Sequence, residues 1–98
     1  MNNRKHGDFG YLINEVRRLC QEKATGTLFI TGDNKYLAQI SFKEGKIVLL
    51  SCLNKSGIEV VPLIRQIPSG WLQFVKLKIT DNFLLPANAD ILAALGGA

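Results

Sequence analysis

The sequence predicts an α+β domain: a helix, a three-stranded antiparallel meander, a second helix, a fourth strand and a short C-terminal helix. Three observations predict it. The spacing of apolar residues changes from a helical to a strand period near residue 25. Two turn sequences of four residues then separate three short β-like segments, which is typical of a meander. Helical spacing returns after residue 57 and again near the C-terminus.

The length of 98 residues favours one domain, because domains usually contain about 100–150 residues. We expect the polar residues 1–7 to be a flexible N-terminus and residues 8–98 to form a single domain. Hydrophobic residues make up 47% of the chain and charged residues 20%, a balance that excludes a mainly disordered protein. The length also excludes a large enzyme with a separate substrate domain.

Residues 8–24 are predicted to form the first helix. Asp8 is a suitable N-cap residue, because its carboxylate can accept a hydrogen bond from the first turn. Thr25 and Gly26 are expected to end the helix, since glycine relieves the left-handed conformation that follows many helices. One face of the helix is apolar and carries Leu12, Val16, Leu19 and Cys20.

Residues 27–31, 36–42 and 47–52 are predicted to form the three strands of the meander. The turn before the third strand contains Gly45, which can adopt the positive φ that tight hairpins need. Alternation along the second strand places four residues on one side, which are Tyr36, Ala38, Ile40 and Phe42.

Residues 57–67 are predicted to form the second helix, with Ser56 as its N-cap and Glu59 as the capping-box partner. Pro62 fits without cost only in the first turn of that helix, because proline has no backbone N–H. Residues 71–79 alternate again and are predicted to form the fourth strand.

The last predicted element is a short helix over residues 88–95. Asn88 is a suitable N-cap residue, and Asp90 in the first turn complements the positive end of the helix dipole. Gly96 and Gly97 are expected to stop the helix.

The formal net charge is +4 at pH 7, from twelve Lys and Arg against eight Asp and Glu. The charge is spread along the chain without a block of five or six like charges, so we interpret it mainly as a solvated surface. A small basic nucleic-acid-binding module is the alternative hypothesis. Its phosphate contacts would come from Arg4, Lys5, Arg17, Arg18 and Lys23.

The sequence contains no catalytic, metal-binding or phosphate-binding motif, so we expect no enzyme activity, no metal and no cofactor. The single histidine, His6, lies in the expected flexible start, where no partner would orient it as a base. Cys20 and Cys52 are expected to be small buried hydrophobic residues. An enzymatic role for Cys52 would require a depressed thiol pKa.

Four segments share a pattern of glycines and apolar residues: Thr25–Leu28, Ile40–Val48, Gly57–Val60 and Gly70–Phe74. In this order they resemble the PATAN-type domain of bacterial signalling proteins, which is often fused to response-regulator receiver domains. The resemblance extends over about residues 10–95. It implies the helix, meander, helix and strand fold described above, and a non-enzymatic module that passes a signal to a partner protein.

We therefore expect a regulatory adaptor that binds a receiver or another signalling protein and forms a homodimer. Its sheet would offer edge strands with unpaired N–H and C=O groups, and its first helix would offer an interaction face with Arg17, Arg18 and Lys23. The sequence has neither a signal peptide pattern nor an apolar run long enough to cross a membrane. The expected location is cytoplasmic.

Overall fold

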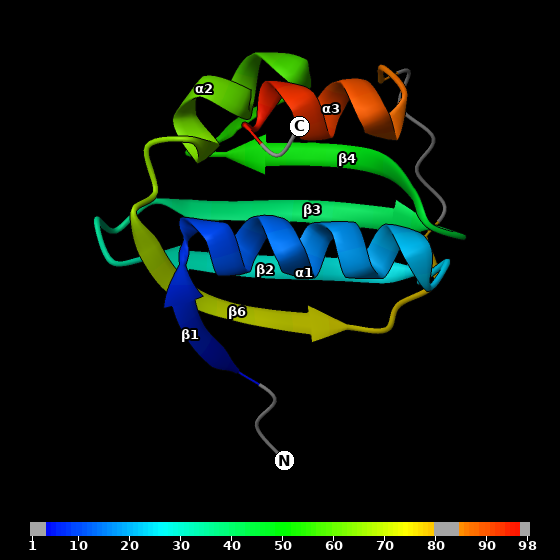
Figure 1. The fold of residues 1–98 in the computed structure, drawn as a ribbon, viewed down its shortest axis with the longest axis horizontal. Coiled ribbons are helices and arrows are strands. Elements are labelled where there is room, and N and C mark those ends of the chain that lie inside the picture. Colours follow the sequence, from blue (N-terminus) through cyan, green and yellow to red (C-terminus); the bar gives the residue numbers. More distant parts are fainter. Residues whose placement is uncertain (1–3, 80–84, 97–98) are drawn as a thin grey trace.

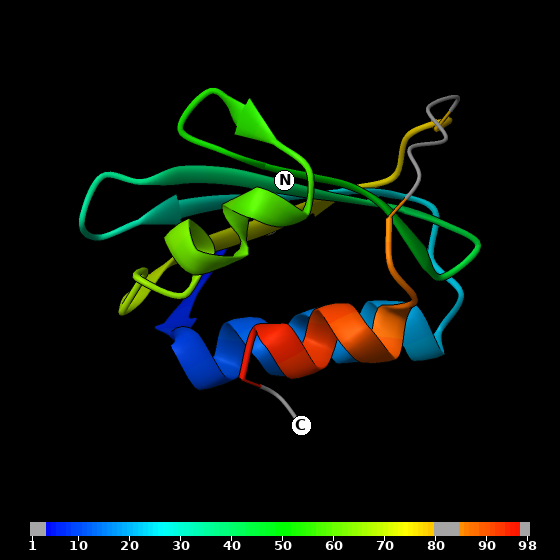
Figure 2. The same cartoon turned by 90° about the horizontal axis from the view of Figure 1, so that it is seen from above.

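An antiparallel sheet with helices packed on one face forms the centre of the molecule (Figures 1 and 2). The structure, a computed structural model, describes residues 4–79 and 85–96, and these form six strands, three α-helices and one 3-10 turn. The strands are β1 (Lys5–Asp8), β2 (Gly26–Gly32), β3 (Leu37–Lys43), β4 (Lys46–Cys52), β5 (Lys55–Ser56) and β6 (Ser69–Val75). The helical elements are α1 (Phe9–Gln21), η1 (Ile58–Val60), α2 (Val61–Ile64) and α3 (Asn88–Ala94).

The spatial order of the strands is β1-β6-β2-β3-β4-β5, and every neighbouring pair is antiparallel. The sequence predicted the α+β class and the meander of β2, β3 and β4, and the structure confirms both. The predicted number of strands is wrong, because the described residues form six strands where four were expected. The two additional strands, β1 and β5, are short and polar, so no alternation of apolar residues marks them.

Helix α1 begins as predicted and ends earlier than predicted. The Asp8 carboxylate caps it by accepting a hydrogen bond of 2.8 Å from the Tyr11 N–H. The helix stops before residue 24 because Lys23 adopts a positive φ of 54°. The Ala24 N–H then bonds to the Leu19 carbonyl at 3.1 Å, a pattern that closes many helix ends. Glycine is therefore not the stop signal here.

The hydrophobic core lies between the sheet and the helices. Along β3 the predicted alternation is confirmed, because Ala38, Ile40 and Phe42 are buried whereas Leu37 and Gln39 are exposed. Burying one such apolar side chain contributes about 1.5–3 kcal/mol. The largest fully buried side chains come from helices and strands alike: Phe42, Leu19, Leu28, Ile30, Ile40, Ile47, Leu50, Ile64, Ile67, Ile91, Leu95 and Val16.

The predicted second helix is wrong in its length and its cap. Instead of one helix over residues 57–67, the chain forms the short η1 and then α2. Pro62 lies in the first turn of α2, where its missing N–H costs nothing, but it prevents one helix from running through this point. Ser56 lies in β5, so the N-cap of η1 is Gly57, at a φ of 99° and without a side-chain hydrogen bond.

Strand β6 is shorter than the predicted strand over residues 71–79. Its last cross-strand pair is Val75 with Thr27, next to the start of β2. Residues 76–79 have no described strand to pair with, which is why the ladder stops there. Among the described residues, no helix is long and apolar enough to cross a membrane.

Asn88 connects α3 to the hairpin of β3 and β4. Its side-chain oxygen accepts a hydrogen bond of 2.9 Å from the Ile47 N–H, and its side-chain nitrogen donates one of 2.8 Å to the Gly45 carbonyl. The prediction that Asn88 caps the helix is wrong, because the N-cap residue is Ala87. Gly96 follows the helix at a φ of 88°, as expected for a stop, while Gly97 lies outside the described residues.

We expect Gly45→Ala to destabilise the fold by about 1–3 kcal/mol. Gly45 has a φ of 84°, and a Cβ there would lie 2.6 Å from the Cys20 carbonyl oxygen and 2.9 Å from the Lys23 Cα. Gly57→Ala is the matched control, because Gly57 also has a positive φ of 99° but open space around it. Urea unfolding should show the larger loss for Gly45→Ala. Equal losses would contradict a role for the close contact between the hairpin and α1.

We expect Asn88→Ala to cost about 1–3 kcal/mol, because it leaves two backbone groups of the hairpin without their partner. Asn88→Asp should also destabilise the protein, since a carboxylate can accept from the Ile47 N–H but cannot donate to the Gly45 carbonyl. The control is Asn14→Ala on the exposed side of α1. Urea unfolding measures all three variants, and unchanged stability of Asn88→Ala would contradict this assignment.

Candidate functional site

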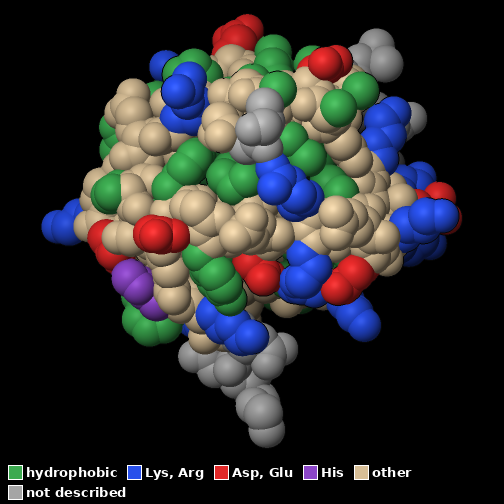
Figure 3. Space-filling model, viewed as in Figure 1, with side chains coloured by type: hydrophobic (Ala, Val, Ile, Leu, Met, Phe, Trp, Pro, Cys, Tyr) green, Lys and Arg blue, Asp and Glu red, His purple; other side chains and the backbone are tan. Residues whose placement is uncertain are grey.

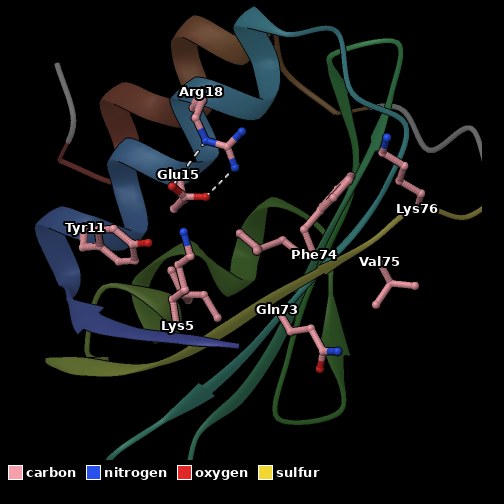
Figure 4. A pocket seen from close by; sticks show the side chains of 10 residues that line it. Lys5, Tyr11, Glu15, Arg18, Gln73, Phe74, Val75 and Lys76 are labelled. Atoms are coloured by element: carbon pink, nitrogen blue, oxygen red, sulfur yellow. Dashed lines mark hydrogen bonds and ion pairs between the residues drawn. The ribbon is translucent and has the colours of Figure 1, made fainter. Parts of the chain in front are cut away.

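A groove of about 610 Å³ lies between α1 and the second half of β6 (Figure 4). We call it the β6 groove. Side chains of the core, Leu28, Leu72 and Phe74, contribute its apolar part. The polar part of its lining comes from the helix and from the two neighbouring strand ends, and it includes Lys5, Tyr11, Glu15, Arg18 and Lys76.

The groove exists because β1 covers only part of β6. The pairing of these strands ends at Lys5 and Leu72, whereas β6 continues to Val75. Among residues 4–79 and 85–96, no strand pairs with the outer edge of residues 73–75. Backbone groups on such an edge are a template for another strand. Phe74 points toward α1, while the Gln73 and Val75 side chains point away from it (Figure 4).

Arg18 forms the helix side of the groove and is held by two glutamates. Its Nη2 and Nε donate to the Glu15 carboxylate at 2.7 and 3.3 Å, and its Nη1 donates to Glu22 at 2.9 Å. The hydrogen bonds that Arg18 donates to Glu15, followed by the one to Glu22, raise the pKa of Arg18 above its ordinary value. The guanidinium therefore stays charged and keeps one orientation, in which it lies beside Glu15 over the groove (Figure 4).

The two lysines of the groove lie at its opposite ends (Figure 4). Neither Lys5 nor Lys76 forms a salt bridge with a carboxylate in the described part of the chain. Charged side chains gather along the side of α1 that faces β6, as the space-filling view shows (Figure 3). With Arg18 already paired, the two lysine ammonium groups give the groove a positive potential that favours a negatively charged ligand.

Of the three predicted interaction residues, Arg18 lines the β6 groove, whereas Arg17 and Lys23 do not. Arg17 is half-buried at the helix position before Arg18, and successive helix positions point in different directions. Lys23 is exposed beyond the end of α1, where its Cα lies close to Gly45. The sequence reasoning missed Lys76, which β6 brings to the groove from the other half of the chain.

A second polar cluster lies at the opposite end of β6 and includes His6. Its Nε2 lies 2.8 Å from the Asp33 carboxylate, which can only accept, so Nε2 carries the proton. Ser69 donates to the same carboxylate oxygen at 2.5 Å, and the Trp71 ring packs edge-on against His6 with centroids 5.0 Å apart. The expectation that His6 has no fixed partner is therefore wrong. Pairing of β1 with β6 holds it in place.

The hydrogen bonds of this cluster are not ordered as in a nucleophilic triad, in which serine bonds to histidine and histidine to aspartate. Ser69 bonds to Asp33 and not to His6, so no histidine is placed to take the serine proton. The hydrogen bond from Ser69, followed by that from His6, lowers the pKa of Asp33. The arrangement fixes the position of β1 against the turn between β2 and β3.

The cysteines do not have the environment of reactive thiols. Cys52 is buried and Cys20 is half-buried, and burial raises the pKa of both thiols. A nucleophilic cysteine needs the opposite shift. Within the described residues, no three His, Cys, Asp or Glu side chains form a group that could hold a metal ion.

Comparisons with known proteins do not place the chain in a family. No family model matches it, and neither a curated protein nor a solved structure matches it. The resemblance to PATAN-type domains therefore stays a prediction from the sequence, and the function has to be argued from the surfaces described above.

We expect Asp33→Asn to change the acid stability of the protein. A lowered carboxyl pKa stabilises the folded state at neutral pH, and this stabilisation is lost as the pH falls through the pKa of folded Asp33. Asp33→Asn should therefore lower the thermal unfolding midpoint at pH 7. Acidification from about pH 5 to pH 2 should then lower the midpoint of Asp33→Asn by less than the midpoint of the unmodified chain. Glu59→Gln, at an exposed carboxylate, is the control. Identical acid profiles for the unmodified chain and Asp33→Asn would contradict this role.

Proposed function

We propose that this protein is a non-enzymatic interaction module of bacterial signalling that binds an extended, acidic segment of a partner protein in the β6 groove. The observation that carries the proposal is the outer edge of residues 73–75, which lies beside apolar side chains and two lysines. Strand edges of this kind bind peptides by adding a further strand to the sheet.

The geometry suits a short strand that continues where β1 ends. A segment paired with residues 73–75 would be about 10 Å long, at about 3.3 Å per residue. Its backbone would form hydrogen bonds with β6, and one of its side chains would contact Phe74 and Leu72. Such a contact is small, so we expect binding that is reversible and transient.

The charges at the two ends of the β6 groove favour an acidic ligand. Lys5 and Lys76 stand at the two ends of the groove, so acidic residues before and after the pairing segment would meet an ammonium group. The net charge of +4 would also attract an acidic partner at a distance. A basic segment would meet like charges at both ends.

Two further observations support the proposal that the module has no catalytic role. The Ser69, Asp33 and His6 cluster lacks the order of a catalytic triad, and Cys52 is buried with a raised pKa. The resemblance to PATAN-type domains implies a receiver or another signalling protein as the partner, in the cytoplasm. The acidic segment of that partner is what the β6 groove would recognise.

Fluorescence anisotropy with a labelled peptide tests the proposal. The probe is an eight-residue peptide of alternating Glu and Val, which we expect to bind, whereas a Lys and Val peptide should not. The double variant Lys5→Glu with Lys76→Glu should weaken binding at least about tenfold. Lys46→Glu with Lys55→Glu, on β4 and β5 at the other side of the sheet, has the same net charge and should bind as the unmodified chain does.

Two further measurements separate this function from others. A peptide with N-methylated backbone amides cannot pair with β6, so it should bind more weakly than the same sequence without methyl groups. Equal binding of both would contradict strand addition. Single-stranded DNA is a further probe. Tighter binding of DNA than of the acidic peptide, with a steep loss of affinity in salt, would favour the nucleic-acid-binding alternative.

A further inference from the structure

The backbone of Phe74 directs its N–H and C=O groups to the outer edge of β6. In an antiparallel sheet both groups of a residue point to the same neighbouring strand, and the direction alternates along the chain. The Asp33 N–H, just after β2, donates a hydrogen bond of 2.8 Å to the Ser69 carbonyl, so Ser69 points to β2. The pairing of β6 with β2 then runs without a shift in register. Gln73 and Val75 therefore also point to β2, and Phe74 points outward.

Phe74 thus offers one complete pairing position to a ligand strand. The outward residue before it, Leu72, is already paired with Lys5 of β1. In the described part of the chain, no strand reaches Phe74 from that side. A ligand residue opposite Phe74 would exchange two hydrogen bonds with it. The side chain of that residue would lie beside the Phe74 ring, on the α1 side of the sheet, where Leu28 and Leu72 make the groove apolar (Figure 4).

Strand β1 limits how far a ligand can extend along this edge. Lys5 lies two residue positions, about 7 Å, from the point opposite Phe74. A ligand strand that continued in this direction would collide with β1. In the other direction, past Val75, the described ranges contain no strand along the edge. A bound segment therefore has to turn away or end beside Lys5.

The charge at this boundary favours a negatively charged chain end. The Lys5 side chain extends from β1 toward α1, so its ammonium group lies on the groove side (Figure 4). Glu15 also lines the groove, but its carboxylate is paired with the Arg18 guanidinium at 2.7 Å, which compensates its charge. A C-terminal carboxylate could accept from both the Phe74 N–H and the Lys5 ammonium group. An amino-terminal end would meet a like charge there.

We propose that the β6 groove binds the C-terminus of its partner protein, with the last residue opposite Phe74 and the terminal carboxylate between the Phe74 N–H and Lys5. The inference rests on the function proposed above and adds which part of the partner is bound. The ligand runs antiparallel to β6, so its earlier residues extend past Val75. The residue two positions before its end lies on the groove side, beside Lys76. The groove therefore selects an apolar last residue and an acidic residue two positions before it.

Fluorescence anisotropy with three labelled peptides tests the inference. The first is an eight-residue peptide that ends in Glu-Ser-Val with a free carboxylate. The second has a C-terminal amide, and the third has two glycines added after the Val. The first should bind at least about tenfold more tightly than the other two, because the amide removes the charge and the glycines move the carboxylate away from Lys5.

A charge-matched pair of variants identifies the group that binds the carboxylate. Lys5→Gln should weaken binding of the free carboxylate peptide to the level of the amide, so the difference between the two disappears. Lys76→Gln removes an equal charge at the other end of the groove, so it should weaken both peptides and keep the difference. Thermal unfolding shows that each variant is folded. A difference that persists in Lys5→Gln, or disappears in Lys76→Gln, would overturn the inference.

Hydrogen exchange followed by NMR tests the position of the peptide. The Phe74 N–H should exchange more slowly when the first peptide is bound, because it gains an acceptor. The Gln73 N–H is the internal control, since it points to β2 with or without peptide. Unchanged exchange at Phe74 would overturn the inference.

The peptides also separate the two proposals. Equal affinity for the carboxylate and amide peptides would overturn recognition of a C-terminus but leave strand addition in place. No binding of any of them, nor of the alternating Glu and Val peptide, would overturn the proposed function and this inference with it.

Discussion

The position of β6 between β2 and β1 is the constraint on which the other features depend. Because β6 pairs with β2 from Gly70 to Val75, its residues fill the sheet beside α1 and complete the core with Leu72. Because β1 then covers only its first half, the second half keeps a free edge in the described structure. The β6 groove, the place of His6 and the contact of His6 with Trp71 all follow from this one arrangement.

Local patterns in the sequence predict the elements whose residues carry an apolar period or a turn residue. Helix α1, the meander and the positive φ of Gly45 were predicted in this way. Strand β1 could not be predicted, because the polar residues 5–8 become a strand only through a partner far along the chain. The hydrogen bonds from Asn88 to the β3–β4 hairpin could not be predicted either, since an asparagine at the start of a helix is typical of an N-cap.

The candidate site was predictable only in part, for the same reason. Arg18 stood out as a basic residue on the first helix, and the structure places it in the groove. Lys5 and Lys76 come from opposite ends of the chain, so their common site depends on the pairing of β1 with β6. Within the described ranges, no strand pairs with the outer edge of residues 73–75, and that edge is what the two lysines flank.

The pairing of β1 with β6 also bears on how the chain folds during synthesis. The meander contains only contacts between neighbouring segments, which form quickly. Lys5 leaves the ribosome early, yet its partner Leu72 is made much later. Strand β1 is therefore made well before its partner and is among the last of the six strands to find its place. Until then the edge of residues 69–72, which β1 later covers, is open to a strand from another chain.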